Sequence, residues 1–134
     1  MSKLLDRRSR LLAWLMGRRV YVPRYLERIA RELFPKEIDS LLRGVCPWCG
    51  RRLSSFRARI SHLGRGACGE RLRLMVATID SVVERCLEHV WRSRGTRGCT
   101  VYIVEVGGRR ARFRSMEEAM LFAVREIAGC SAEV

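Results

Sequence analysis

Four side chains that can bind a metal most constrain the fold of this chain: Cys46, Cys49, His62 and Cys68. Two residues separate the first pair of cysteines, twelve residues follow before the histidine, and five more precede the last cysteine. This spacing is typical of tetrahedral zinc sites, in which a tight turn carries the first two thiolates. We expect His62 to project from a short helix and Cys68 to follow it in a glycine-rich turn. The spacing therefore predicts one structural zinc ion.

Other interpretations of the cysteines stay open at this stage. The four residues could be buried or redox-active cysteines beside an unrelated histidine, although all four types fall at zinc spacing. The zinc could also only stabilise a small core, since a structural zinc contributes on the order of 10 kcal/mol to folding. Of the remaining cysteines, Cys86 lies on an apolar helix stripe and should be core. Cys99 and Cys130 should lie too far apart for a disulfide.

The segment from Cys46 to Leu63 resembles a zinc finger with two cysteines and two histidines, in which cysteine replaces the last histidine. It is most similar to the solitary fingers of small archaeal and archaeal-virus proteins. Leu53 falls at the family's first core position, whereas Arg59 falls at the second and departs from the pattern. We expect Phe56 and Ile60 to fill the core in place of Arg59.

The resemblance also implies where a finger would read bases. Mapped backward from His62, the three reading positions are Ser55, Ala58 and Ser61. None of these side chains can make the bidentate contacts that discriminate strongly between bases. The resemblance thus implies nucleic-acid binding with little sequence reading. His89, outside the finger, is expected to be a helix surface residue and not a ligand.

The charge of the chain is strongly positive and unevenly distributed. The formal net charge is +13, and all but two of the basic residues are arginines. The chain lacks Asn and Gln, a pattern typical of thermophilic proteins, and biased codon usage with ion pairing could also explain the arginines. Between Ser40 and Gly69, however, there are six arginines and no carboxylate. Such a patch attracts polyanions, and we expect phosphate contacts from Arg51, Arg52, Arg57, Arg59 and Arg65.

The pattern of apolar residues predicts an α+β fold that is mostly helical, with one zinc finger and a C-terminal β-hairpin plus helix. We divide the chain into an N-terminal helical segment (1–44), the finger (45–69), a long central helix (70–95) and the hairpin unit (96–134). Expected helices cover residues 3–16, 23–34, 36–43, 70–92 and 115–129. The apolar stripe of helix 70–92 should face the core, although the same stripe would suit a homodimer seam.

The hairpin has a predictable register. Gly107 and Gly108 form a two-residue turn between strands 100–106 and 109–114. That turn places Val106, Val104 and Tyr102 opposite Arg109, Ala111 and Phe113 on the core face. On the other face, Arg110, Arg112 and Arg114 oppose Glu105, Ile103 and Val101. Those arginines could follow phosphates, or their stems could cover Val101 and Ile103.

These features favour one class of function. No apolar run is long enough for a membrane span or a signal peptide, so we expect a cytoplasmic protein. No catalytic motif appears, and four protein ligands leave a zinc ion without an open position, so we do not expect an enzyme. We expect a nucleic-acid-binding protein, with DNA ahead of RNA, acting as a regulator in an archaeon or its virus. The alternatives are an RNA- or ribosome-associated protein and an interaction module for an acidic protein partner.

Overall fold

The computed structural model describes residues 6–132, except for the side chains of residue 96 and residues 128–132. The chain packs into two units. The first contains residues 1–23 and 30–80, and the second contains residues 24–29 and 81–134. Helices and one antiparallel sheet account for the secondary structure, which confirms the predicted α+β, mostly helical fold class.

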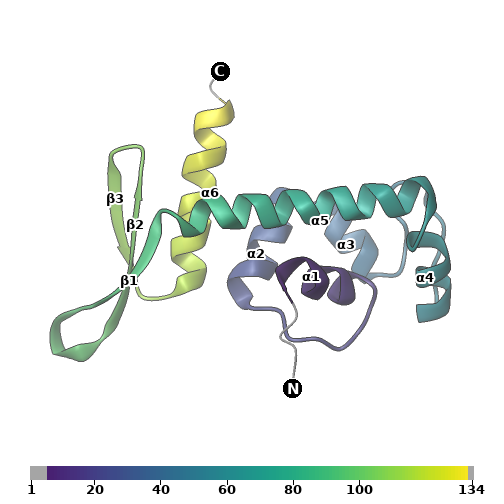
Figure 1. The fold of residues 1–134 in the computed structure, drawn as a ribbon, viewed down its shortest axis with the longest axis horizontal. Helices are drawn as coiled ribbons and strands as arrows, with labels where there is room; N and C mark the ends of the chain where they lie inside the picture. The colour runs from purple at the N-terminus through teal and green to yellow at the C-terminus, as the bar shows by residue number, and fades with distance from the viewer. Residues whose placement is uncertain (1–5, 133–134) are drawn as a thin grey trace. The chain divides into compact units, whose positions relative to one another are not determined.

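Helices build the first unit (Figure 1). Its core consists of aliphatic side chains that are almost fully buried, among them Leu11, Leu15, Ile38, Leu41, Leu63, Leu72 and Ile79. The helices that supply them are α1 (Arg7–Leu15), α3 (Pro35–Leu42), α4 (Phe56–Leu63) and the first part of α5 (Gly66–Leu87). Helix α2 (Arg24–Leu33) contributes residues to both units. The N-terminal helix predicted from residue 3 begins at Arg7, and residues 3–5 lie outside the described residues.

Two helices of the first unit end in the same way. Gly17 follows α1 with a φ of 89°, and Gly44 follows α3 with a φ of 83°. In each case the glycine amide and the next amide donate to carbonyls of the last turn: Gly17 to Trp14 and Arg18 to Ala13, Gly44 to Leu41 and Val45 to Ser40. This is the Schellman arrangement, which needs a left-handed residue directly after the helix. Both glycines therefore fix where their helix stops.

An ion cluster ties α1 to α5 within the first unit. Arg7 Nε lies 2.8 Å from Asp80 Oδ1, and Arg8 Nε lies 3.0 Å from Asp80 Oδ2. Burial opposes ionisation of Asp80, but the two guanidinium groups outweigh it and lower the pKa of its carboxyl. A charge with two such partners is stabilised even though it is largely withdrawn from water.

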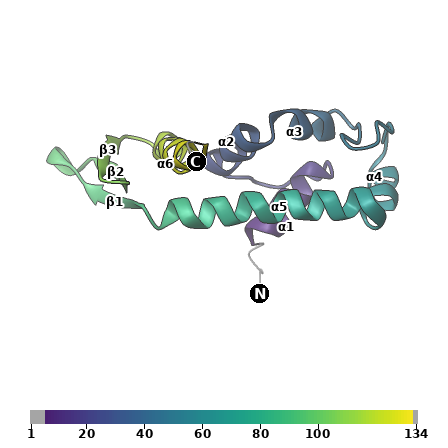
Figure 2. The same ribbon diagram turned by 90° about the horizontal axis from the view of Figure 1, so that it is seen from above.

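The second unit combines a three-stranded antiparallel sheet with α6 (Met116–Ala132). The strands β1 (Val90–Arg94), β2 (Thr100–Val106) and β3 (Arg109–Phe113) lie in the order β1–β2–β3. Helix α6 packs on the sheet (Figure 2), and the rings of Phe113 and Phe122 are 5.4 Å apart. Ser115 caps α6 by accepting a 3.2 Å hydrogen bond from the Glu118 amide.

The predicted hairpin register is confirmed for the five pairs from Tyr102–Phe113 to Val106–Arg109. The predicted composition of the core face is also correct in part, because Val104 and Val106 are buried. Ile103, predicted on the outer face, is nevertheless only 5% exposed. The cross-strand neighbours of Ile103 are Trp91 and Arg112, and their side chains can cover it.

The prediction of a helix over 70–92 was wrong at both ends. Helix α5 begins at Gly66 and ends at Leu87, and residues 90–94 form β1, an edge strand in a segment that was expected to be helix and loop. Val90 fits the helical period, but it pairs with Val104 in the sheet. Helix α6 likewise continues to Ala132, beyond the predicted end at Gly129.

The other cysteine and histidine predictions have mixed outcomes. Cys86 is fully buried, as expected. His89 lies in the turn after α5 and not in the helix, with its Nδ1 3.1 Å from the Glu105 carbonyl oxygen. Cys99 is a free cysteine, as expected, and the side chain of Cys130 lies outside the described residues. In the described part of the chain, no helix is both long and apolar enough to cross a membrane.

Candidate metal centre

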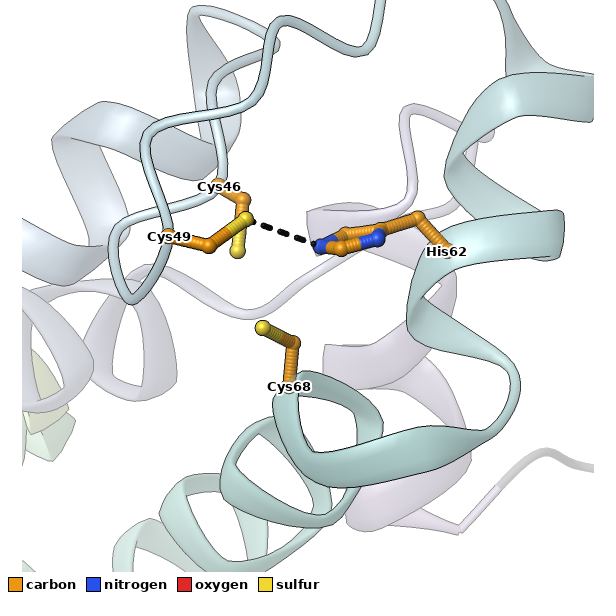
Figure 3. Close-up of side chains that lie close together, drawn as sticks. All are labelled: Cys46, Cys49, His62 and Cys68. Atoms are coloured by element: carbon orange, nitrogen blue, oxygen red, sulfur yellow. Dashed lines mark hydrogen bonds between the residues drawn. The ribbon is translucent and has the colours of Figure 1, made fainter.

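The structure brings the four predicted ligands together. One donor atom from each of Cys46, Cys49, His62 and Cys68 lies within 4.8 Å of every other (Figure 3). Cys49 Sγ is 3.2 Å from His62 Nε2, which identifies Nε2 as the ring nitrogen that faces the thiols. Cys46 is buried, Cys49 is exposed, and the other two are half-buried. These residues are close enough to hold a metal ion, and the predicted grouping is confirmed.

The first two thiols are held by a short turn that is closed by backbone hydrogen bonds. The Cys46 amide donates to the Arg51 carbonyl (2.9 Å), and the Gly50 amide donates to the Cys46 carbonyl (2.8 Å). Gly50 has a φ of 79°, a conformation that glycine adopts without strain. One isolated antiparallel bridge pairs Val45 with Arg52 across this turn.

The other two ligands come from two successive helices. His62 lies in the last turn of α4, whose first residue follows Ser55, and Ser55 caps the helix by accepting from the Ala58 amide at 3.1 Å. Cys68 was expected in a turn after that helix, but it lies in the first turn of α5. Only Gly64 and Arg65 separate the two helices. A metal ion held by these four residues would therefore link α4, α5 and the cysteine turn.

Gly69 allows α4 and α5 to approach closely at this point. It is buried, and a Cβ at this position would lie 2.6 Å from the Leu63 carbonyl oxygen. Real Cβ atoms do not approach backbone oxygens so closely. The residue after the last ligand must therefore be glycine for Cys68 to reach the other three donors.

The thiols differ in acidity when no metal is bound. The Arg51 amide, which donates to Cys49 Sγ, is the main cause of a lowered pKa for Cys49. Burial and the neighbouring thiols raise the pKa of Cys68 to about 11. Cys49 therefore loses its proton more readily than Cys68. A metal ion bound here would displace the proton of Cys68.

The donor set fits zinc. Around a tetrahedral zinc with Zn–S bonds of about 2.3 Å, sulfur atoms lie about 3.8 Å apart. Donor atoms all within 4.8 Å of one another match that geometry after small side-chain movements. Three thiolates and one imidazole also suit zinc better than magnesium or calcium, which prefer oxygen ligands.

Arg59 occupies the inward position at which the finger family has a core residue. Its Nε donates to the Leu53 carbonyl at 3.4 Å, and its guanidinium lies against the two helix-ending glycines, Gly17 and Gly44. A cation beside two helix C-termini is favourable, because each terminus carries partial negative charge. Arg59 was predicted to contact nucleic acid, yet these contacts give it a structural role.

The expectation that Phe56 and Ile60 fill the core in place of Arg59 was wrong. Phe56 is 41% exposed and Ile60 is 44% exposed, whereas Leu53 and Leu63 are each only 2% exposed. Phe56 packs instead under Arg18, whose guanidinium carbon lies 4.9 Å from the ring centre. With Arg59 inside, its two neighbours on α4 face outward.

A basic groove adjoins the metal centre, and we call it the finger groove. It has a volume of about 440 Å³. Arg51 and Arg52 of the cysteine turn, Arg65 between the helices, and Ser61 of α4 line it, together with residues 66–68 at the start of α5. The predicted base-reading positions Ala58 and Ser61 are therefore part of its wall, while Ser55 is not.

No ion pair among the described residues neutralises four arginines of this region. The side chains of Arg51, Arg52, Arg57 and Arg65 are exposed, and none has an ion pair within the part of the chain that the structure describes. The first turn of α5 also contains no acidic residue, so its amide groups add positive potential. The arginines were predicted from the sequence, but this helix terminus was missed because the helix was expected to begin at residue 70.

Comparisons of the chain with protein-family models, with curated proteins and with solved structures found no match.

Proposed function

We propose that this chain is a zinc-stabilised nucleic-acid-binding protein that holds phosphates of the backbone in the finger groove. The zinc ion would be ligated by Cys46, Cys49, His62 and Cys68 and would be structural, because four protein ligands leave no open position for a reaction. We accordingly propose no enzymatic activity.

The observation that carries this proposal is the convergence of basic groups on one concave surface. Three arginine side chains and the amide end of a helix line the finger groove. A zinc ion with three thiolates and one neutral histidine has a formal charge of about −1, which offsets only part of that charge. Guanidinium groups and helix N-termini are the usual protein contacts to phosphate oxygens.

The groove supports affinity better than sequence selectivity. Its uncharged polar side chain outside the ligand set is Ser61, which cannot make a bidentate contact to a base. We therefore propose binding to duplex DNA through its phosphates, with structured RNA as the alternative target. Phosphate contacts alone give weak sequence preference and a strong dependence on salt.

The test is a titration of labelled duplex DNA and duplex RNA over a series of salt concentrations. The quadruple variant Arg51→Gln, Arg52→Gln, Arg57→Gln and Arg65→Gln should flatten the log–log salt slope by about 0.9 for each phosphate that is no longer neutralised. A charge-matched control replaces Arg19, Arg24, Lys36 and Arg85, which are exposed and outside the groove. Equal reductions in affinity in both variants would show that only net charge matters and would remove the groove from the proposal.

One observation favours a second candidate function, an interaction module for a protein partner. Leu74 on α5 is 68% exposed and lies at a groove of about 340 Å³ that Phe34, Trp48 and Met75 also line. An exposed apolar patch of this kind is common at protein interfaces. Leu74→Ser should leave nucleic-acid binding unchanged, and loss of a protein partner in that variant would favour the second candidate.

A further inference from the structure

The sheet of the second unit carries a basic surface of its own. From Val90 to Arg114 the sequence contains seven arginines and a single carboxylate, Glu105. Arg109 forms a 2.9 Å ion pair with Glu126, and the other six arginines have no ion pair among the described residues. Nucleic-acid contacts confined to the metal centre would leave this charge unexplained.

The strand register separates the two faces of the sheet. Trp91, Ile103 and Arg112 form one row across the three strands, and directly paired residues point to the same side. Phe113 belongs to the adjacent row, so it points to the opposite side, where it contacts Phe122 of α6. Helix α6 thus covers the Phe113 side. We call the other side the Trp91 face, which comprises Trp91, Ser93, Val101, Ile103, Glu105, Arg110 and Arg112.

An exposed aromatic ring lies on this face beside two arginines. Trp91 is 41% exposed, and the guanidinium carbon of Arg110 lies 5.6 Å from its ring centre. Arg110 is paired in register with Glu105, which offsets part of its charge. Arg112 is exposed, and its side chain has no hydrogen-bond or ion-pair partner among the residues that the structure describes. Because neighbouring strands are about 4.8 Å apart, Trp91 and Arg112 lie about 10 Å apart across the row.

This combination is chemically suited to unpaired nucleotides. An exposed indole offers a flat surface on which a base can stack, and every base has such a face. Bases in a duplex are already stacked on one another and cannot use the indole in this way. Arginines beside the ring can contact the phosphates that flank a stacked base. We propose that the Trp91 face binds single-stranded nucleic acid, with a base on Trp91 and phosphates on Arg110 and Arg112.

This surface does not depend on the finger groove. It belongs to the second unit, whereas the metal ligands and the finger arginines belong to the first. It also takes a different ligand, a single strand in place of a duplex. The chain would then hold paired and unpaired segments of nucleic acid on separate surfaces.

The experiment measures binding of zinc-loaded full-length protein to labelled oligo(dT) and oligo(U) at one low salt concentration. Trp91→Leu keeps an apolar side chain over Ile103 but removes the aromatic ring, and it should weaken binding roughly 5- to 150-fold, as expected for loss of one stacked base. Trp91→Phe keeps a ring and should lose much less affinity. Arg112→Gln should weaken binding and lower the salt dependence. Tyr21→Leu, at an aromatic residue that is 74% exposed outside the sheet, is the matched control and should have no effect.

Several outcomes would overturn the proposal. Unchanged binding in Trp91→Leu or in Arg112→Gln would do so. So would loss of oligo(dT) and oligo(U) binding in the finger quadruple variant, because the finger groove would then hold the single strand. Circular dichroism checks that each variant is folded, and if Trp91→Leu fails to fold, the comparison of Arg112→Gln with wild type decides. If the protein did not bind duplex DNA or RNA, the proposal for the finger groove would fail. Binding of single strands could still depend on Trp91 in that case, so the two proposals are tested separately.

Discussion

Replacing Arg59 by methionine should destabilise the first unit much more than the same change at Arg57. Methionine keeps an unbranched stem in both cases but removes the guanidinium. The Arg59→Met variant loses the hydrogen bond to the Leu53 carbonyl and the positive charge beside the C-terminal glycines of α1 and α3. Arg57, on the same helix, is exposed and has no partner in the described structure. The pair of variants therefore separates the structural arginine from a solvent-facing one.

The magnitude follows from the interactions that the guanidinium makes. A cation at a helix C-terminus contributes about 0.3–1 kcal/mol, and Arg59 lies at two such termini. The 3.4 Å hydrogen bond is long, so it adds about 0.5 kcal/mol. The total is about 1–2.5 kcal/mol, which lowers the Tm of a unit of this size by roughly 4–20 °C. Arg57→Met should change stability by less than about 0.5 kcal/mol.

Thermal unfolding of the zinc-loaded variants, followed by circular dichroism, measures this difference. Binding to duplex DNA should show the reverse order, with a flatter salt slope for Arg57→Met and little change for Arg59→Met. Similar Tm values for the two variants would refute the structural role of Arg59. A loss of binding in Arg59→Met without a loss of stability would return Arg59 to the phosphate-binding residues.

Three further predictions concern the metal centre and its support. Gly69→Ala should weaken zinc binding, because the added Cβ would clash with the Leu63 carbonyl oxygen. Gly107→Ala, at a turn position with open space around it, should leave the zinc affinity unchanged. Competition with a chelator measures the zinc affinity of both variants. Zinc affinity should fall as pH falls, about tenfold per pH unit for each proton released, because the Cys68 thiol with its pKa of about 11 must lose its proton to bind; an affinity that does not change over about two pH units below neutrality would contradict this. Asp80→Asn should lower the free energy of unfolding, measured with urea at neutral pH, by about 1–2 kcal/mol. The pKa of Asp80 is lowered in the folded protein, so its ionised carboxylate stabilises the fold at pH values above the ordinary pKa of aspartate. This stabilisation is lost as the pH falls through the pKa of the folded state. The free energies of unfolding of wild type and variant should therefore become equal in acid.

The sequence was sufficient to predict features that local spacing determines. The four metal ligands were found because zinc geometry restricts both residue type and separation. The hairpin register was found because a two-residue glycine turn leaves one pairing of the flanking strands. In both cases the residues that interact lie close together along the chain.

The errors have a different cause, since they depend on contacts in the folded structure that local spacing does not specify. Val90 continues a helical pattern, and only its pairing with Val104 makes it part of a strand. Phe56 and Ile60 seemed suited to the finger core, but Arg59 enters that region because Gly17 and Gly44 lie there. The spacing that identifies Cys68 as a ligand does not show that it begins the next helix.

The metal centre should hold one zinc ion with three sulfur ligands and one nitrogen ligand. X-ray absorption at the zinc edge, combined with elemental analysis of the purified protein, measures both number and ligation. We expect one zinc per chain, with three sulfur atoms at about 2.3 Å and one nitrogen at about 2.0–2.1 Å. Cys68→Ser should lower the sulfur count to two. Protein that is folded without bound metal, or a metal shell made mainly of oxygen, would contradict the assignment of Cys46, Cys49, His62 and Cys68 as a structural zinc site.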